Sequence, residues 1–146
     1  MELKLFSNQT IFIDTAPLIY YIEENPIYLK PLRHLFLAYE EYGYLFMSSV
    51  ITLIEVLVLP LRYKKNELAQ RYETILTNSK AIKLIAIDDE IAKIAARLRA
   101  EYSLKTPDAI QLATAIAYSA DTFLTNDKRL KTIKEINVIT LDELVI

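Results

Sequence analysis

The sequence predicts an α/β fold: one domain over residues 1–146, with a mostly parallel central sheet and helices on both faces of that sheet. Short apolar runs, such as 11–13 and 122–125, alternate along the chain with longer segments in which apolar residues recur at helical spacing. The length of 146 residues suits one domain, and a hydrophobic share of 53% excludes intrinsic disorder. No stretch rich in glycine and serine divides the chain.

The first half of the chain predicts two strands and four helices. The apolar run 11–13 reads as a buried strand, and the Asn25-Pro26 pair closes the helix that follows it. Gly43 stops the second helix, since glycine favours the left-handed conformation at a helix end. In order, the elements are a strand over 11–13, helices over 17–24 and from 29 to Gly43, a strand over 44–47, a helix opened by Ser48-Ser49 and running through Val58, and a helix over 66–77.

The second half predicts three further strands between amphipathic helices. Apolar residues at helical spacing mark a helix around 91–98, and Thr106-Pro107 supplies a helix cap followed by proline at the first helical position. In order, the elements are a strand over 81–87, a helix around 91–98, an alanine-rich helix from Thr106, a strand over 122–125, a short helical turn over 128–131 and a strand over 137–141.

Composition excludes several classes of site. The absence of cysteine excludes disulfides, thiolate metal sites and thiol nucleophiles. A single glycine excludes the glycine-rich phosphate and dinucleotide loops, and a single histidine excludes mechanisms that need two. The formal net charge of −2 is not that of a protein that wraps nucleic acid with a strongly basic surface.

The sequence gives no reason to expect a membrane protein. Residues 43–61 are mostly apolar, but Glu55 lies near the middle of this run and Pro60 closes it, so a buried strand followed by a buried helix explains it better than a membrane span. Met1 to Lys4 show no basic and apolar signal segment. We therefore expect a cytoplasmic protein with no membrane contact.

Four acidic residues lie against apolar sequence: Asp14, Glu55, Asp108 and Asp127. Each could have an ordinary structural role, because Asp14, Asp108 and Asp127 suit helix caps or turns. Glu55 lies in a helix that is apolar on nearly every face, so we expect it to meet a cation, a hydrogen-bonding partner or a cleft rather than water. A buried salt bridge is the alternative for Glu55.

As a set, the four acids suggest a metal site. Asp14 and Asp127 follow predicted strands, and ligands of parallel sheets bind beyond the carboxyl ends of the strands. Four converging carboxylates repel one another unless a cation is present, and oxygen ligands without cysteine favour Mg2+ or Mn2+. Such an ion binds phosphate oxygens and activates water without a histidine. Thr125, Asn126 and Ser49 are candidates to hydrogen-bond the ligands or a phosphate.

The chain resembles the PIN-domain family, most closely the VapC-type toxins of toxin–antitoxin pairs. Four pieces carry the resemblance, in the family's order and covering the chain almost end to end: IFIDTAPLIYY from Ile11, SSVITLIEV from Ser48, LKTPDAIQLATAI from Leu104 and FLTNDKRL from Phe123. Each piece alone is weak, whereas the ordered set is fairly specific.

The resemblance implies a PIN-like α/β fold and a Mg2+- or Mn2+-dependent endoribonuclease, a hydrolase that leaves 5′-phosphate and 3′-hydroxyl ends on RNA. It implies that Asp14, Glu55, Asp108 and Asp127 are the catalytic and metal-binding residues, and that the protein forms a homodimer inhibited by an antitoxin. Many relatives carry another acid after the last one, whereas this chain has Lys128 and Arg129, which are candidates to bind the RNA backbone. An RNA-maturation nuclease and a catalytically weak PIN-fold binding module are the alternatives.

Overall fold

The computed structural model describes residues 9–144, which form one five-stranded sheet with all neighbouring strands parallel and the strand order β3-β2-β1-β4-β5. Met1 to Lys4, where we found no signal segment, lie outside these residues. The strands are β1 (Thr10–Ile13), β2 (Leu45–Ser49), β3 (Ile82–Ile85), β4 (Thr122–Thr125) and β5 (Asn137–Thr140).

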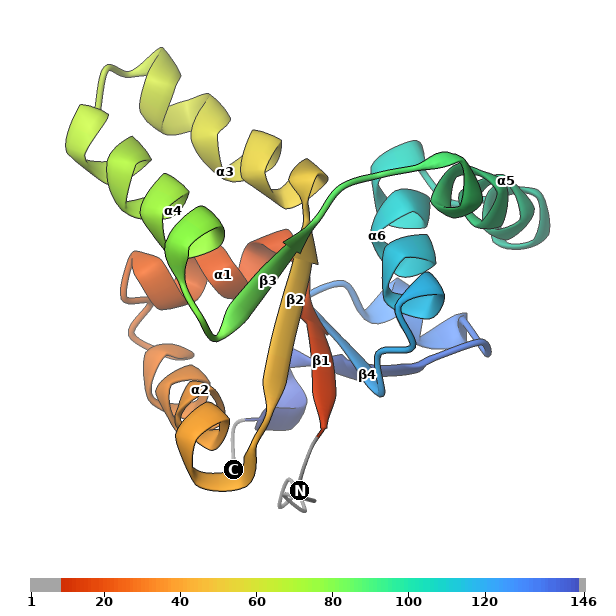
Figure 1. The fold of residues 1–146 in the computed structure, drawn as a ribbon, viewed down its shortest axis with the longest axis horizontal. Coiled ribbons are helices and arrows are strands. Elements are labelled where there is room, and N and C mark those ends of the chain that lie inside the picture. The colour runs from red at the N-terminus through yellow and green to blue at the C-terminus, as the bar shows by residue number, and fades with distance from the viewer. Residues whose placement is uncertain (1–8, 145–146) are drawn as a thin grey trace.

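Helices cover both faces of the sheet, as the sequence predicts. Figure 1 shows α1 to α4 on one side of the strands and α5 and α6 on the other. The helices are α1 (Thr15–Ile22), α2 (Leu29–Tyr42), α3 (Val50–Arg62), α4 (Asn66–Asn78), α5 (Asp89–Tyr102) and α6 (Thr106–Ala117), with short 3-10 helices η1 (Lys128–Thr132) and η2 (Leu141–Leu144). The predicted fold class is confirmed.

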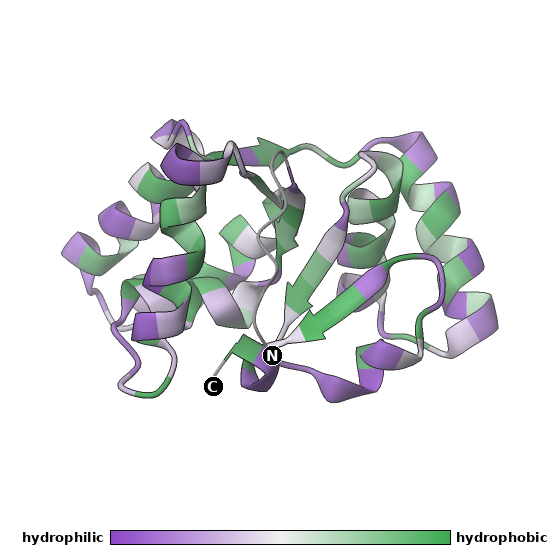
Figure 2. Ribbon diagram, turned by 90° about the horizontal axis from the view of Figure 1, so that it is seen from below, coloured by the Kyte–Doolittle hydropathy of each residue, from purple (hydrophilic) through white to green (hydrophobic). Residues whose placement is uncertain are grey.

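Each face of the sheet has its own hydrophobic core. Strand residues alternate between the faces: Ile11 and Ile13 pack with α1 to α4, whereas Phe12 packs with α5 and α6. The Phe12 and Phe123 rings stack with centroids 5.2 Å apart, which ties β1 to β4. Figure 2 shows the result, with hydrophobic strands in the middle and hydrophilic residues along the outer sides of the helices.

The order of the strands reverses at β1. The chain runs outward from β1 through β2 to β3, and then returns to place β4 and β5 on the other side of β1. In open parallel sheets, the crevice beyond the carboxyl ends of the two strands at such a reversal is the usual ligand site. In this protein, these strands are β1, followed by Asp14, and β4, followed shortly by Asp127.

Several element boundaries differ from prediction, and three of the differences bear on the candidate site or on packing. Helix α1 begins at Thr15 rather than residue 17, because the Asp14 side chain accepts a hydrogen bond from the Thr15 amide and caps the helix. Ser49 ends β2 and caps α3 instead of lying in the helix. Helix α3 continues beyond Val58 to Arg62 through Pro60, whose buried ring contributes to packing while costing the helix one amide donor.

The apolar run 43–61 forms β2 and most of α3, as expected. Among residues 9–144, we find no helix with the length and apolar content that crossing a membrane requires.

Candidate functional site

Asp14 lies at the carboxyl end of β1 and is held by three hydrogen bonds. Its Oδ1 accepts from the Thr15 amide at 2.9 Å and from Gln111 Nε2 at 3.4 Å, and its Oδ2 accepts from the Thr125 hydroxyl at 2.8 Å. Burial raises the pKa of Asp14, and Asp108 nearby raises it further, although these hydrogen bonds act in the opposite direction. Asp14 is therefore a well-positioned carboxylate whose negative charge is poorly compensated.

Thr125, the last residue of β4, connects the two strand ends. Its hydroxyl donates to Asp14 and accepts a hydrogen bond of 3.1 Å from the Asp127 amide. The residue is 1% exposed, so its geometry is fixed by the core. The predicted role of Thr125 beside the acids agrees with this contact.

Gln111 of α6 lies at the centre of a buried polar network below Asp14. Its amide donates to Thr52 at 2.6 Å and to Asp14, and its carbonyl oxygen accepts a hydrogen bond from Ser49. Ser49 therefore reaches Asp14 only through Gln111. Sequence reasoning missed Gln111 and Thr52; the available signal was a polar residue in a run of alanine and leucine, three residues after Asp108.

Asp108 lies in the first turn of α6 and is partly buried. Burial raises its pKa, the neighbouring Asp127 raises it further, and Arg129 and Lys105 lower it. Within the described part of the chain, its carboxylate makes no hydrogen bond or ion pair. Asp108 is thus available to bind a ligand. Lys105, whose charge acts on this group, was not recognised from the sequence.

Glu55 corrects one of our expectations. Its side chain is exposed, because the face of α3 that carries it also leaves Ile54, Val58 and Leu59 exposed. The apolar sequence around Glu55 therefore did not indicate a buried position. Partial burial nevertheless raises the pKa of Glu55, Asp14 and Asp108 raise it further, and a hydrogen bond with the Thr15 side chain lowers it, so Glu55 has a hydrogen-bonding partner as expected.

Asp127 differs from the other three acids because it is neutralised by Arg129. The guanidinium donates from Nε to Asp127 Oδ1 at 3.0 Å and from Nη2 to Oδ2 at 2.8 Å, and the Arg129 amide also donates to Oδ1. These contacts hold the pKa of Asp127 below its ordinary value. The side chains of Arg129 and Asp127 are 79% and 28% exposed, so the pair lies at the surface.

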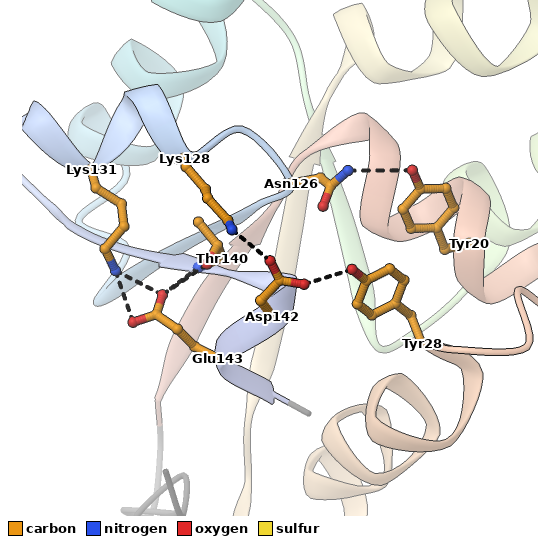
Figure 3. Close-up of polar contacts among 8 residues, drawn as sticks. All are labelled: Tyr20, Tyr28, Asn126, Lys128, Lys131, Thr140, Asp142 and Glu143. Carbon is orange, nitrogen blue, oxygen red and sulfur yellow. Dashed lines mark hydrogen bonds and ion pairs between the residues drawn. The ribbon is translucent and has the colours of Figure 1, made fainter. Parts of the chain in front are cut away.

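The other two candidates on this segment, Lys128 and Asn126, contact residues outside the group of four acids. Lys128 pairs with Asp142 at 3.0 Å, and Asp142 also accepts a hydrogen bond of 2.7 Å from Tyr28 (Figure 3). Asn126 donates to the Tyr20 hydroxyl at 3.3 Å. These contacts anchor the segment after β4 to α1, to η2 and to the residue before α2, and the role of Lys128 and Asn126 in binding RNA or a phosphate stays a prediction.

The four acids form two adjoining groups rather than one closed cage. In the region from residue 9 to 144, no three acidic or histidine side chains lie close enough to hold a metal ion together. Neighbouring carboxylates nevertheless raise three of the pKa values: Asp108 raises the pKa of Asp14, Asp14 and Asp108 raise that of Glu55, and Asp127 raises that of Asp108. Their oxygen-only donors, and the lack of an ion pair at Asp14, Glu55 and Asp108 among residues 9–144, fit a hard divalent cation.

A comparison with protein families gives a match over most of the chain. The model of the PIN domain family matches residues 11–136. No curated protein matches the sequence of this chain.

Solved structures share the fold over most of the chain. A toxin–antitoxin complex from Klebsiella pneumoniae is 30% identical, with a TM-score of 0.69, and the match covers 90% of this chain and 97% of that one. VapBC2 from Rickettsia felis, bound to a promoter DNA fragment, gives 20% identity, a TM-score of 0.75 and coverages of 90% and 98%. VapC20 from Mycobacterium tuberculosis, a toxin that cleaves the sarcin–ricin loop, is 15% identical with a TM-score of 0.62, and the match covers 77% of this chain and 86% of that one. The matches at 20% and 15% identity establish a common fold.

Proposed function

Because this chain belongs to the PIN domain family, we propose that it is a Mg2+- or Mn2+-dependent endoribonuclease, and that it acts as the toxin of a toxin–antitoxin pair. The observation that carries the proposal is the group formed by Asp14, Glu55 and Asp108 beside the reversal of strand order. Asp108 raises the pKa of Asp14, both of these acids raise the pKa of Glu55, and no cation of residues 9–144 forms an ion pair with any of the three.

We propose that Asp14, Glu55 and Asp108 hold the ion after their side chains move closer together than they lie here, and that Asp127 joins them when Arg129 releases it. Ionised carboxylates suit this role better than hydroxyl groups, because only the carboxylates balance the charge of a divalent cation. When bound, the ion supplies positive charge against the phosphate oxygens of RNA. Thr125 and Gln111 fix the orientation of Asp14 and so preorganise the group.

Glu55 is proposed to orient the attacking water and to accept its proton. Its side chain is exposed, so water reaches it, and its raised pKa makes it a better proton acceptor than an ordinary glutamate. The oxygen of this water forms a bond to phosphorus while the bond from phosphorus to the 3′-oxygen breaks. The 3′-oxygen takes up a proton from solvent, which leaves a 5′-phosphate and a 3′-hydroxyl end.

The test is cleavage of a mixed cellular RNA by purified protein from which any partner has been removed. We expect cleavage with Mg2+ or Mn2+, none with a chelator, and none from Asp14→Asn or Asp108→Asn. Asp89→Asn is the matched control, since Asp89 is an exposed acid at the start of α5. Thermal melts of each variant exclude unfolding as the cause of lost activity.

The pairing of Asp127 with Arg129 favours one alternative, a PIN-fold module that binds its partners without cleaving RNA. Arg129 already neutralises Asp127, one of the four acids. If Arg129 stayed there, Asp127 could not bind a metal ion, and the site would bind the ion more weakly. Absence of both Mn2+ binding and RNA cleavage in the folded wild-type protein would support this module and overturn the nuclease proposal.

We also propose an antitoxin partner and a homodimer. Support for an antitoxin comes from the solved relatives, several of which are toxin–antitoxin complexes. Support for a dimer comes from the exposed apolar face of α3, where Ile54, Val58 and Leu59 are 58%, 42% and 55% exposed. Exposed apolar patches of this kind mark protein interfaces, and a symmetric dimer pairs one such face with its own copy.

A further inference from the structure

Positive charge is distributed unevenly around the candidate site. Asp14 and Glu55 have acidic neighbours, whereas the region between Asp108 and Asp127 also contains Lys105 and Arg129. A cavity of about 360 Å³ lies in this second region, and all four of the residues Lys105, Asp108, Asp127 and Arg129 line it. One half of the site thus attracts a cation, while the other half already has two cations of its own.

Arg129 is held in a fixed orientation by Asp127. Two guanidinium nitrogens, Nε and Nη2, donate to the two carboxylate oxygens, and within residues 9–144 the third, Nη1, makes no hydrogen bond. Because the side chain is 79% exposed, its remaining donors can reach a ligand in the cavity. A planar guanidinium with free donors is well suited to a phosphate.

Lys105 faces the same cavity from the residue before α6. Its side chain is exposed, and none of the carboxylates in the described part of the chain forms an ion pair with it. Its charge nevertheless acts on both Asp108 and Asp127. Asp108 and Asp127 on the same cavity oppose the binding of an anion, so the groups that would bind it are the unpaired ammonium of Lys105 and the free donors of Arg129.

We propose that the cavity between Lys105 and Arg129 is a subsite for one phosphate of the RNA backbone, next to the phosphate that is cut. This inference rests on the proposed ribonuclease function. While the pair with Arg129 is closed, Asp127 positions the guanidinium, and part of the positive charge beside the acids comes from the chain itself.

The test is the salt dependence of RNA binding in a chelator, where no cleavage takes place. A short, fluorescently labelled single-stranded RNA is titrated with wild type, Lys105→Gln and Arg129→Gln at several salt concentrations. Each phosphate contact that is lost should reduce the slope of log K against log salt by about 0.7. Lys30→Gln and Arg33→Gln remove exposed charges from α2 and should leave the slope unchanged.

Two further measurements distinguish a subsite for backbone phosphate from general charge attraction and from a site for free phosphate. Arg129→Lys keeps the positive charge but loses the two-point contact of a guanidinium with a phosphate. This variant should therefore keep the wild-type slope of log K against log salt while binding RNA more weakly. Inorganic phosphate at constant ionic strength should not displace the RNA; displacement would assign the cavity to free phosphate and overturn the proposal. If Arg129→Gln unfolds, the salt slope of Lys105→Gln still tests the subsite, because within residues 9–144 the Lys105 side chain forms no ion pair that the substitution would remove.

Unchanged slopes for both variants, or equal changes in the α2 controls, would overturn the subsite. This outcome differs from failure of the proposed function. If the variants reduce the slope but wild type does not cleave RNA, the subsite proposal stands and the nuclease proposal falls. If wild type cleaves RNA but the slopes are unchanged, the nuclease proposal stands and the subsite proposal falls.

Discussion

The Thr125 hydroxyl donates a 2.8 Å hydrogen bond to Asp14 Oδ2, so the last residue of β4 holds the carboxylate that follows β1. The two residues are 111 positions apart in the chain. Their contact depends on the parallel pairing of β1 with β4, in which Ile13 lies beside Leu124. The fold therefore assembles the centre of the candidate site before any ligand arrives.

Thr125→Val should raise the pKa of Asp14 further and reduce stability. Valine has a similar shape but donates no hydrogen bond, so an oxygen of a largely buried carboxylate loses its partner, at a cost of about 1–3 kcal/mol. Urea denaturation and the pH titration of the Asp14 carboxyl by NMR measure the two effects. Thr122→Val, at the half-buried start of β4, is the matched control; it removes only a long hydrogen bond of 3.4 Å from Asn137 and should change neither quantity appreciably.

Gln111→Leu should also destabilise the protein, by about 1–3 kcal/mol. Leucine fills a similar volume, but Ser49 and Thr52 lose their hydrogen-bonding partner in the core. The midpoint of urea denaturation measures the loss. Gln70→Leu on the exposed side of α4 is the control, and an equal effect of both substitutions would mean that the buried network contributes nothing specific.

Glu55→Gln should leave the melting temperature of metal-free protein equal or higher at pH 7, and unchanged near pH 4. Burial, Asp14 and Asp108 raise the pKa of Glu55 above its ordinary value of 4.5. The folded state therefore binds this proton more tightly than the unfolded state, and the associated stability is lost as pH rises through the raised pKa. Glutamine removes this penalty, which exists only at the higher pH.

Thermal melts across this pH range, with a chelator present, measure the effect of Glu55→Gln. Glu73→Gln on the exposed surface of α4 controls for the loss of one negative charge. A large fall in the melting temperature of Glu55→Gln at pH 7 would instead indicate that the carboxylate has a stabilising cationic partner.

Tyr28→Phe should raise the pKa of Asp142 toward its ordinary value. The hydrogen bond from Tyr28 is the main cause that lowers this pKa, and Lys128 is the second (Figure 3). Phenylalanine keeps the ring that stacks on Tyr20 but removes the donor. NMR titration of the Asp142 carboxyl measures the change, and Tyr39→Phe on α2 should leave it unaltered. A titration curve identical to that of wild type would contradict the proposed anchoring contact.

Sequence reasoning was most successful where position along the chain determines position in the fold. Asp14 and Thr125 lie at the ends of neighbouring parallel strands, so their placement at one edge of the sheet follows from the strands themselves. It failed for Glu55, because an apolar helix does not reveal which of its faces remains uncovered. It missed Gln111, since one amide in an alanine-rich helix gives no indication of its partners. The contact between Asp127 and Arg129 depends on the backbone conformation of η1, which a turn motif in the sequence does not determine.

Val58→Glu should convert the proposed homodimer into a monomer. Val58 lies on the exposed apolar face of α3 with Ile54 and Leu59, and a symmetric dimer that pairs this face with itself would bury a carboxylate from each copy. Light scattering during size-exclusion chromatography measures the mass at several protein concentrations. Leu37→Glu is the control, because Leu37 is a similarly exposed residue on α2, at 52%. A dimer that survives Val58→Glu but dissociates with Leu37→Glu would assign the interface to α2, and a wild-type monomer at all concentrations would remove the homodimer proposal altogether.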